Sequence, residues 1–202
     1  MAKLVAFYSR ADENYFGGTT RYITVGNTEK VAKQIAAMTG ADLFKIEQKV
    51  PYAADYYTCI DQAKKDLKAK ARPELVTMLP SLDAYDEIYL GYPNYWGTMP
   101  MAVYTFLEAY DFTGKKIHPF CTHEGSGLAG TERDIRRTAK GAEVTKGLAI
   151  NGSSADGLPG TVLLSPGPSL CPCSASGGGD KGTDQATEEP SLMHSLKVFS
   201  KT

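Results

Sequence analysis

Residue types that define several functional classes are scarce in this chain of 202 residues. Its four cysteines do not make a disulfide framework for a chain of this length. Cys171 and Cys173 form the one closely spaced pair, and no second Cys or His pair stands near them to complete a zinc site. We therefore interpret Cys59, Cys121 and this pair as incidental thiols, and we expect no metal centre.

An excess of charge of one sign is also missing, because 22 Lys and Arg oppose 23 Asp and Glu. This balance gives no electrostatic reason to expect nucleic acid or an anionic membrane surface as a partner. No stretch of 18 apolar residues occurs either, so the sequence predicts no membrane-spanning helix. Residues 1–9 lack an apolar region followed by a cleavage site, and we expect a cytoplasmic protein.

What the sequence does contain is an alternation of strand-like and helix-like segments, which is typical of a parallel sheet wrapped by helices. Short apolar runs predict strands at Leu4–Tyr8, Asp42–Ile46, Glu87–Gly91, Lys116–Cys121 and Lys146–Ile150. Helical periodicity predicts helices at Glu29–Met38, Tyr52–Ala71, Pro100–Tyr110 and Arg133–Lys140. The pattern favours a doubly wound α/β fold with a five-stranded parallel sheet in the order 2-1-3-4-5. Such sheets bind ligands outside the carboxyl ends of their strands, which directs attention to the loops after strands one, three and four.

The composition changes after residue 156. Residues 157–202 are rich in Gly, Pro and Ser and then become polar, which makes them a poor closing helix for the fifth strand. We therefore predict one α/β domain at 1–156 and an irregular tail at 157–202.

The first loop offers a site for a phosphate monoester. Ser9 and Arg10 end the first strand, and Gly26, Asn27 and Thr28 open the helix that follows. Hydroxyl and backbone N–H donors at a helix N-terminus suit a phosphate group, since the helix dipole favours negative charge there. Asn27 or Thr28 could equally serve only as the helix cap, and the loop alone does not decide between the two.

The first loop also carries a family resemblance. Residues 8–10 followed by 26–29 resemble the FMN phosphate-binding loop of flavodoxin-like proteins, Ser/Thr-x-Thr-Gly-Asn-Thr. The departure is the inserted segment 11–24, which a branch of that family is similar in carrying. Within the insertion, Tyr15-Phe16-Gly17-Gly18 predicts a turn, either over the cofactor or as a surface flap. The resemblance implies a flavodoxin-like fold over residues 3–156 with FMN as its cofactor.

The second loop lies between strand three and its helix and is rich in aromatic residues. It contains Pro93, Asn94, Tyr95, Trp96 and Gly97, and it resembles the family's flavin-facing loop, Pro-x-Trp-Trp-Gly-x-x-Pro, with Tyr95 in place of the first Trp. A flavin ring needs aromatic faces for stacking and backbone groups for its polar edges. We expect Tyr95 and Trp96 to stack on the flavin, and simple packing is the alternative.

The third loop follows strand four and resembles the family's second flavin-edge loop. Its residues are Thr122, His123, Glu124, Gly125, Ser126 and Gly127. Glycines allow close approach of the backbone, and the hydroxyl groups can donate hydrogen bonds. An acid/base pair of His123 with Glu124 is disfavoured because adjacent side chains rarely face the same way.

The three loops together imply an FMN-binding protein that transfers electrons, with no catalytic side chain because the flavin carries the chemistry. Its partner would then be a redox partner protein. An NAD(P)H-dependent FMN or quinone reductase on the same fold is the alternative, and a homodimer is an open alternative for its assembly. A cofactor-free interaction protein is less favoured because all three loops keep their donors. A phosphoacceptor domain fails because strand one ends in Ser9-Arg10 rather than in carboxylates.

Overall fold

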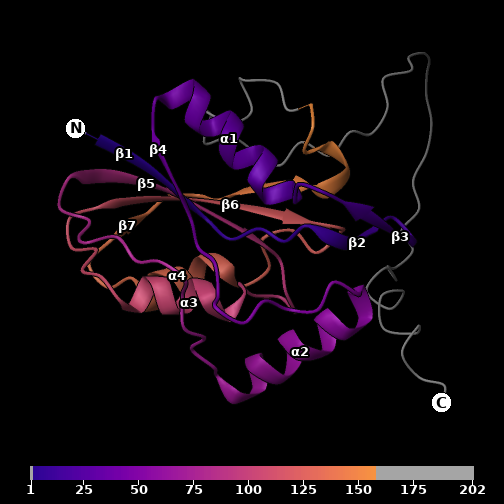
Figure 1. The fold of residues 1–202 in the computed structure, drawn as a ribbon. Helices are drawn as coiled ribbons and strands as arrows, with labels where there is room; N and C mark the ends of the chain where they lie inside the picture. The colour runs from indigo at the N-terminus through magenta and orange to yellow at the C-terminus, as the bar shows by residue number, and fades with distance from the viewer. Residues whose placement is uncertain (1, 158–202) are drawn as a thin grey trace, which may run out of the picture. The chain divides into compact units, whose positions relative to one another are not determined.

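A parallel β-sheet forms the centre of the computed structural model, which describes residues 2–157 (Figure 1). Its strands are β1 (Ala2–Phe7), β4 (Asp42–Lys45), β5 (Tyr85–Pro93), β6 (Lys116–His123), β7 (Glu143–Val144) and β8 (Leu148–Asn151). The order is β4-β1-β5-β6-β7, and β8 also pairs with β6. All these pairings are parallel. The predicted fold class and the order 2-1-3-4-5 are therefore confirmed.

The fifth position of the sheet differs from the single strand expected at 146–150. Two short strands share it: β7 pairs with the start of β6, and β8 pairs with its end. Thr145 turns toward β6 between them, where its N–H donates to the carbonyl of Ile117 (3.0 Å). The interruption divides one edge position into two strands, so the count of strands exceeds the five predicted.

Helices cover both faces of the sheet (Figure 1). They are α1 (Asn27–Thr39), α2 (Tyr56–Ala69), α3 (Met101–Glu108) and α4 (Thr131–Thr138), and a short 3₁₀ helix, η1, spans Gly152–Ser154. Helix α1 lies on one face, where its buried Val31 and Ile35 belong to the same apolar cluster as Val5 and Phe7 of β1. The other three helices lie on the opposite face. Successive strand residues point to opposite faces, so one strand supplies both layers of the core.

Helix α2 begins later than the predicted Tyr52. Asp55 is its N-cap, with an extended backbone, and its side chain accepts a hydrogen bond from the N–H of Thr58 (2.7 Å). Such a cap satisfies a backbone donor that the first turn of a helix leaves free. The segment before Asp55 is therefore a loop, and it contacts the insertion in the first loop.

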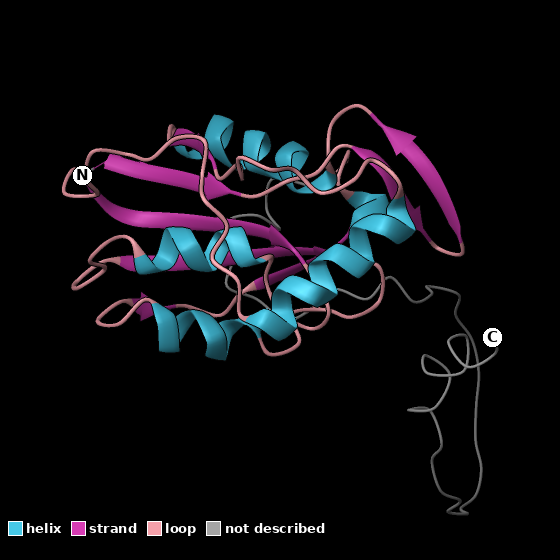
Figure 2. Ribbon diagram, turned by 60° about the horizontal axis from the view of Figure 1, so that its bottom comes forward, coloured by secondary structure: helices cyan, strands magenta, loops and turns pink. Residues whose placement is uncertain are grey.

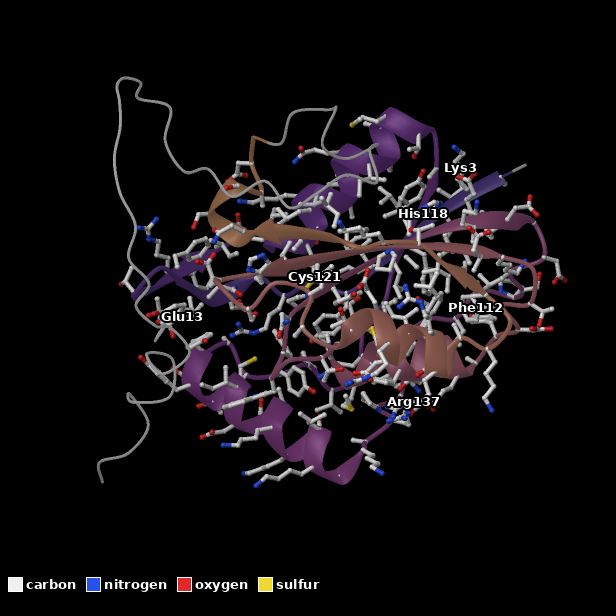
Figure 3. The ribbon with its side chains drawn as sticks, turned by 180° about the vertical axis from the view of Figure 1, so that it is seen from behind. Lys3, Glu13, Phe112, His118, Cys121 and Arg137 are labelled. Atoms are coloured by element: carbon white, nitrogen blue, oxygen red, sulfur yellow. The ribbon has the colours of Figure 1, made fainter. Side chains whose placement is uncertain are left out.

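That insertion folds as a hairpin of its own. Strands β2 (Asp12–Phe16) and β3 (Thr19–Ile23) pair antiparallel, and Gly17 and Gly18 form the turn with φ of 50° and 114°. The hairpin lies at the end of the central sheet toward which β6 points (Figure 1), and it projects beyond the sheet (Figure 2). Glu13 attaches it to α2, because its carboxylate accepts a hydrogen bond from the N–H of Tyr56 (3.0 Å) (Figure 3).

Helices of membrane-spanning length and apolarity do not occur among residues 2–157. The predicted irregular tail lies, apart from Gly157, outside the residues that the structure describes.

Candidate cofactor site

Buried polar side chains gather at the carboxyl ends of the parallel strands. The buried polar and charged residues of the described chain are Thr28, Gln48, Thr98, Thr122, Thr131 and Asp134. Each lies at the end of a parallel strand or in the segment that follows it. Polar groups are costly to bury without hydrogen-bond partners, so their concentration makes this edge the candidate site. The same edge is where doubly wound sheets bind ligands.

Helix α1 presents an uncapped N-terminus to this edge. Its N-cap residue is Gly26, which has no side chain to cap with, and the Ser9 hydroxyl accepts from the N–H of Glu29 (3.0 Å). The N–H groups of Asn27 and Thr28 have no hydrogen-bond partner among the described residues. The buried Oδ1 of Asn27 likewise has none within residues 2–157. These free groups suit a phosphate together with a ligand hydroxyl group.

Gly26 is required here by space rather than by its backbone angles. A Cβ at this position would collide with the Ser9 hydroxyl and with the carbonyl of Arg10. Its φ of −66° is one that any residue adopts. The two halves of the first loop therefore meet directly at Gly26, in spite of the hairpin inserted between them.

Arg10 is committed to backbone carbonyl groups. Its guanidinium donates to the carbonyl oxygens of Glu13 (2.6 Å), Ala53 (2.9 Å) and Ala54 (2.6 Å). It thus joins the base of the hairpin to the segment that precedes α2. The sequence placed Arg10 among the cofactor contacts, but this geometry gives it a structural task in the first loop.

The second loop makes a tight turn. Tyr95 and Thr98 exchange two backbone hydrogen bonds (2.8 and 3.1 Å), and Trp96 and Gly97 between them have φ of 56° and 80°. Positive φ at both central positions is the geometry of a type I′ turn. Asn94 supports the turn, because its Oδ1 accepts from the N–H of Gly97 (3.0 Å). We call residues 95–98 the aromatic turn.

The two aromatic residues of this turn point in different directions. The Trp96 ring is 43% exposed, and its indole N–H donates to the carbonyl of Ile60 on α2 (3.0 Å). Tyr95 packs inward instead, with its ring centre 6.3 Å from those of Tyr8 and Tyr52. Burial raises the pKa of Tyr95 well above its usual value, so its hydroxyl stays protonated. Only Trp96 therefore offers an exposed ring face at the site, where stacking by both residues was expected.

The third loop is built around His123 and Glu124, which face different partners. Nδ1 of His123 accepts from the N–H of Gly125 (3.0 Å), so the imidazole is neutral. Burial lowers the pKa of His123, and the neighbouring Glu124 opposes this shift. Glu124 reaches the tip of the hairpin, where its Oε2 accepts from the N–H of Gly17 (3.3 Å). Among the described residues no group of three or more His, Cys, Asp and Glu is placed to hold a metal.

Two side-chain contacts bring the predicted loops together. Thr28 and Thr122 join the first and third loops through their hydroxyl groups (2.8 Å). Asn94 joins the second and third, since its Nδ2 donates to the carbonyl of Gly127 (2.9 Å). The remaining predicted residues, Pro93 and Ser126, belong to the end of β5 and the third loop.

A cavity of about 170 Å³ adjoins the first loop alone. It lies between the ends of β1 and β4, with Tyr8, Arg10 and Gln48 among its lining residues, and it does not reach the second or third loop. Contacts to a flat ring at the predicted site would therefore come from the exposed parts of the aromatic turn and the third loop. Sequence reasoning missed Tyr52 and Asp134, which contact Tyr95 and Thr98 from beneath the second loop and resemble ordinary helix residues in the sequence, and it treated Tyr8 only as the first residue of the first-loop motif.

A parallel sheet with this strand order, and three joined loops at its carboxyl edge, define a doubly wound α/β protein with a candidate ligand site at the switch point. A flavodoxin family model matches residues 19–160, and the chain belongs to the flavodoxin family. A comparison with curated protein sequences gave no match.

Solved structures of flavoproteins share the fold. A candidate flavoprotein from Bacteroides uniformis is 28% identical over 77% of this chain and 95% of its own, with a TM-score of 0.62. Another, from Bacteroides eggerthii, is 23% identical over 76% and 92%, with a TM-score of 0.59. A flavoprotein from Lactobacillus acidophilus, solved in complex with FMN, is 22% identical over 77% and 96%, with a TM-score of 0.57.

Proposed function

We propose that this protein binds one FMN at the carboxyl edge of its sheet and transfers electrons with it. The observation that carries the proposal is the uncapped start of α1, where free N–H groups adjoin Ser9 and the unpartnered Oδ1 of Asn27. Such a site holds a phosphate monoester, and the loop between β1 and α1 carries no Gly-x-Gly-x-x-Gly turn for the pyrophosphate of a dinucleotide, a pattern that this chain has only at residues 125–130 in the third loop. Membership of the flavodoxin family and the likeness to an FMN-bound flavoprotein support this choice of cofactor.

The proposed contacts follow from which groups are free. The first turn of α1 would hold the phosphate, with Gly26, Asn27 and Thr28 supplying backbone groups. Trp96 and Gly97 would face the flavin ring, and the backbone of 122–127 would line its edge. When bound, FMN supplies the electron chemistry, and the protein binds and orients it and excludes water. Arg10, Tyr95 and Glu124 take supporting roles in this proposal, since their side chains are already engaged.

A one-electron carrier that docks on a redox partner protein is our first candidate within this function. An NAD(P)H-dependent FMN or quinone reductase is the second. The exposed ring of Trp96 favours the second candidate, because a planar nicotinamide or quinone could stack beside it. The absence of a strong net negative charge in the whole chain favours it as well, since carriers usually dock through an acidic face.

Reconstitution tests the cofactor. The purified chain is incubated with FMN or FAD, passed through gel filtration and examined by absorbance, and we expect one FMN per chain to be retained and FAD to be lost. Preferential retention of FAD, or of neither flavin, would contradict the proposal. The FMN-loaded protein is then mixed anaerobically with NADH or NADPH. Rapid bleaching would identify a reductase, and a flavin that is reduced only by a chemical reductant would identify a carrier.

A further inference from the structure

Three buried polar groups meet beneath the aromatic turn. Thr98, Tyr104 on α3 and Asp134 on α4 are each 7% exposed. Oδ2 of Asp134 accepts from the Thr98 hydroxyl (2.9 Å) and lies 3.2 Å from the Tyr104 hydroxyl, and the two hydroxyl oxygens are 2.7 Å apart. This triangle is the one place in the described residues where a buried carboxylate contacts a predicted site loop.

Nearby cations stabilise the Asp134 carboxylate only weakly. Its Oδ1 lies 3.7 Å from Nε of Arg133 and 3.5 Å from Nη2 of Arg137, and both arginine side chains are mostly exposed (Figure 3 labels Arg137 on α4). Ion pairs with exposed side chains are weak. Burial of a carboxylate is costly unless it is hydrogen-bonded. The hydroxyl groups of Thr98 and Tyr104 are therefore the partners on which the burial of Asp134 depends.

Helix α4 and the residue before it contact two consecutive residues of the aromatic turn, Gly97 and Thr98. Asp134 holds the side chain of Thr98, and the N–H of Gly130, just before α4, approaches the carbonyl of Gly97 (3.4 Å). The turn needs such support because Trp96 has a φ of 56°, a conformation that a bulky residue adopts only when its surroundings impose it. The Asn94 side chain and the Ile60 carbonyl supply the other fixed points.

We propose that Asp134 is a positioning residue: through Thr98 it fixes the aromatic turn, and with it the orientation of the Gly97 peptide toward the cofactor. The cofactor part of this inference rests on the proposed FMN function, whereas the structural part does not. Asp134 acts without touching the flavin. Its loss should loosen the turn and change how well the turn accommodates oxidised and reduced flavin.

Trp96 allows the structural part to be tested without any cofactor, because it is the only tryptophan in the chain. Asp134→Asn and Thr98→Val are compared with wild type in the full-length apo-protein. We expect both variants to lose the near-ultraviolet circular dichroism band of Trp96 and to gain quenching by acrylamide, while the far-ultraviolet spectrum stays unchanged. Thr98→Ser retains the hydroxyl and should behave as wild type. Thr105→Val and Asp111→Asn are matched controls on and beside α3, away from the triangle.

The cofactor part is read from the one-electron potentials of the FMN-loaded proteins. We expect both variants to shift the one-electron potential in the same direction, by roughly tenfold in the flavin equilibrium or about 59 mV, and the double variant to shift it no further. A shift in Asp134→Asn but not in Thr98→Val would show a long-range charge effect and overturn the positioning role. An unchanged Trp96 signal in both variants would overturn it as well. If Asp134→Asn does not fold, Thr98→Val decides. If the wild-type protein takes up no FMN, the proposed function is contradicted. The Trp96 measurements on the apo-protein then still decide the role of Asp134.

Discussion

The hydroxyl oxygens of Thr28 and Thr122 lie 2.8 Å apart, and this contact joins the start of α1 to the end of β6. Both side chains are buried, at 2% and 5% exposure, so neither hydroxyl group can turn to water if its partner is removed. The pair therefore connects the proposed phosphate site to the proposed flavin edge through one hydrogen bond. Its loss should affect the stability of the domain as well as the geometry of the site.

Thr28→Val should lower the free energy of unfolding by about 1–3 kcal/mol, because it leaves the buried hydroxyl of Thr122 without a partner. Thr122→Val should have a similar effect. The double variant should cost less than the sum of the two, since no hydroxyl group is then left unpaired. Urea unfolding of the four proteins gives these values, with Thr28→Ser as the variant that keeps the bond. Strictly additive losses would show that the two hydroxyl groups do not interact.

Gly97→Ala should destabilise the aromatic turn through its backbone alone. A Cβ at Gly97 would have no neighbouring atom within 4 Å, so no steric clash is introduced. The φ of 80° is nevertheless unfavourable for alanine, and we expect a loss of about 1–2 kcal/mol in the free energy of unfolding. Gly97→Asn should cost less because asparagine tolerates positive φ better. Equal stability of Gly97→Ala and wild type would mean that the turn adopts another conformation in solution.

The fold could be predicted from the sequence because the strands and helices alternate and each carries its own periodicity. The short apolar runs near residues 4–8, 87–91 and 116–121 have the length and order of parallel strands, and the strand order follows from them. The location of the site could be predicted for the same reason, since it follows the carboxyl ends of these strands.

The direction of individual side chains in the site could not be predicted. Tyr95 and Trp96 are adjacent and chemically alike, yet the positive φ of Trp96 sends their rings to different sides of the turn. Arg10 takes its partners from Ala53 and Ala54, more than 40 residues away. Asp134 lies in a short polar helix that reads as a solvated surface, and only the packing of α3 against α4 buries it. These outcomes depend on contacts between distant segments, which periodicity does not encode.

Glu124→Ala should speed the release of FMN from the loaded protein. The Glu124 carboxylate accepts from the N–H of Gly17 at the tip of the hairpin, and this contact ties the inserted segment to the third loop. A hydrogen bond of about 0.5–1.5 kcal/mol corresponds to a roughly two- to tenfold change in rate if it must break before FMN leaves. Stopped-flow measurement of flavin fluorescence after dilution gives the rate. Glu124→Gln keeps an acceptor oxygen and should release FMN nearly as slowly as wild type.

Glu143→Gln is the control for removal of a carboxylate, because Glu143 lies on β7 and pairs with Lys116 rather than with the hairpin. Equal release rates for wild type and Glu124→Ala would show that the hairpin is a surface flap that does not retain the cofactor. The two alternatives for the insertion are thus separated by one measurement.

The stability of the domain should fall in mild acid partly because of His123. Burial lowers the pKa of His123 below its usual value of 6.5, so the unfolded chain binds a proton at a higher pH than the folded chain does. Stability therefore rises with pH between the folded and unfolded pKa values, and it is lost as the pH falls below 6.5. Protonation would also remove the Nδ1 acceptor for the N–H of Gly125.

His123→Asn supplies a neutral acceptor oxygen and should show a smaller loss of stability. The loss is measured from unfolding midpoints in urea between about pH 8 and about pH 5. His118, whose pKa burial also lowers, remains in both proteins, so the difference between their two profiles isolates His123. Parallel profiles would show that His123 is as accessible to protons in the folded state as in the unfolded chain.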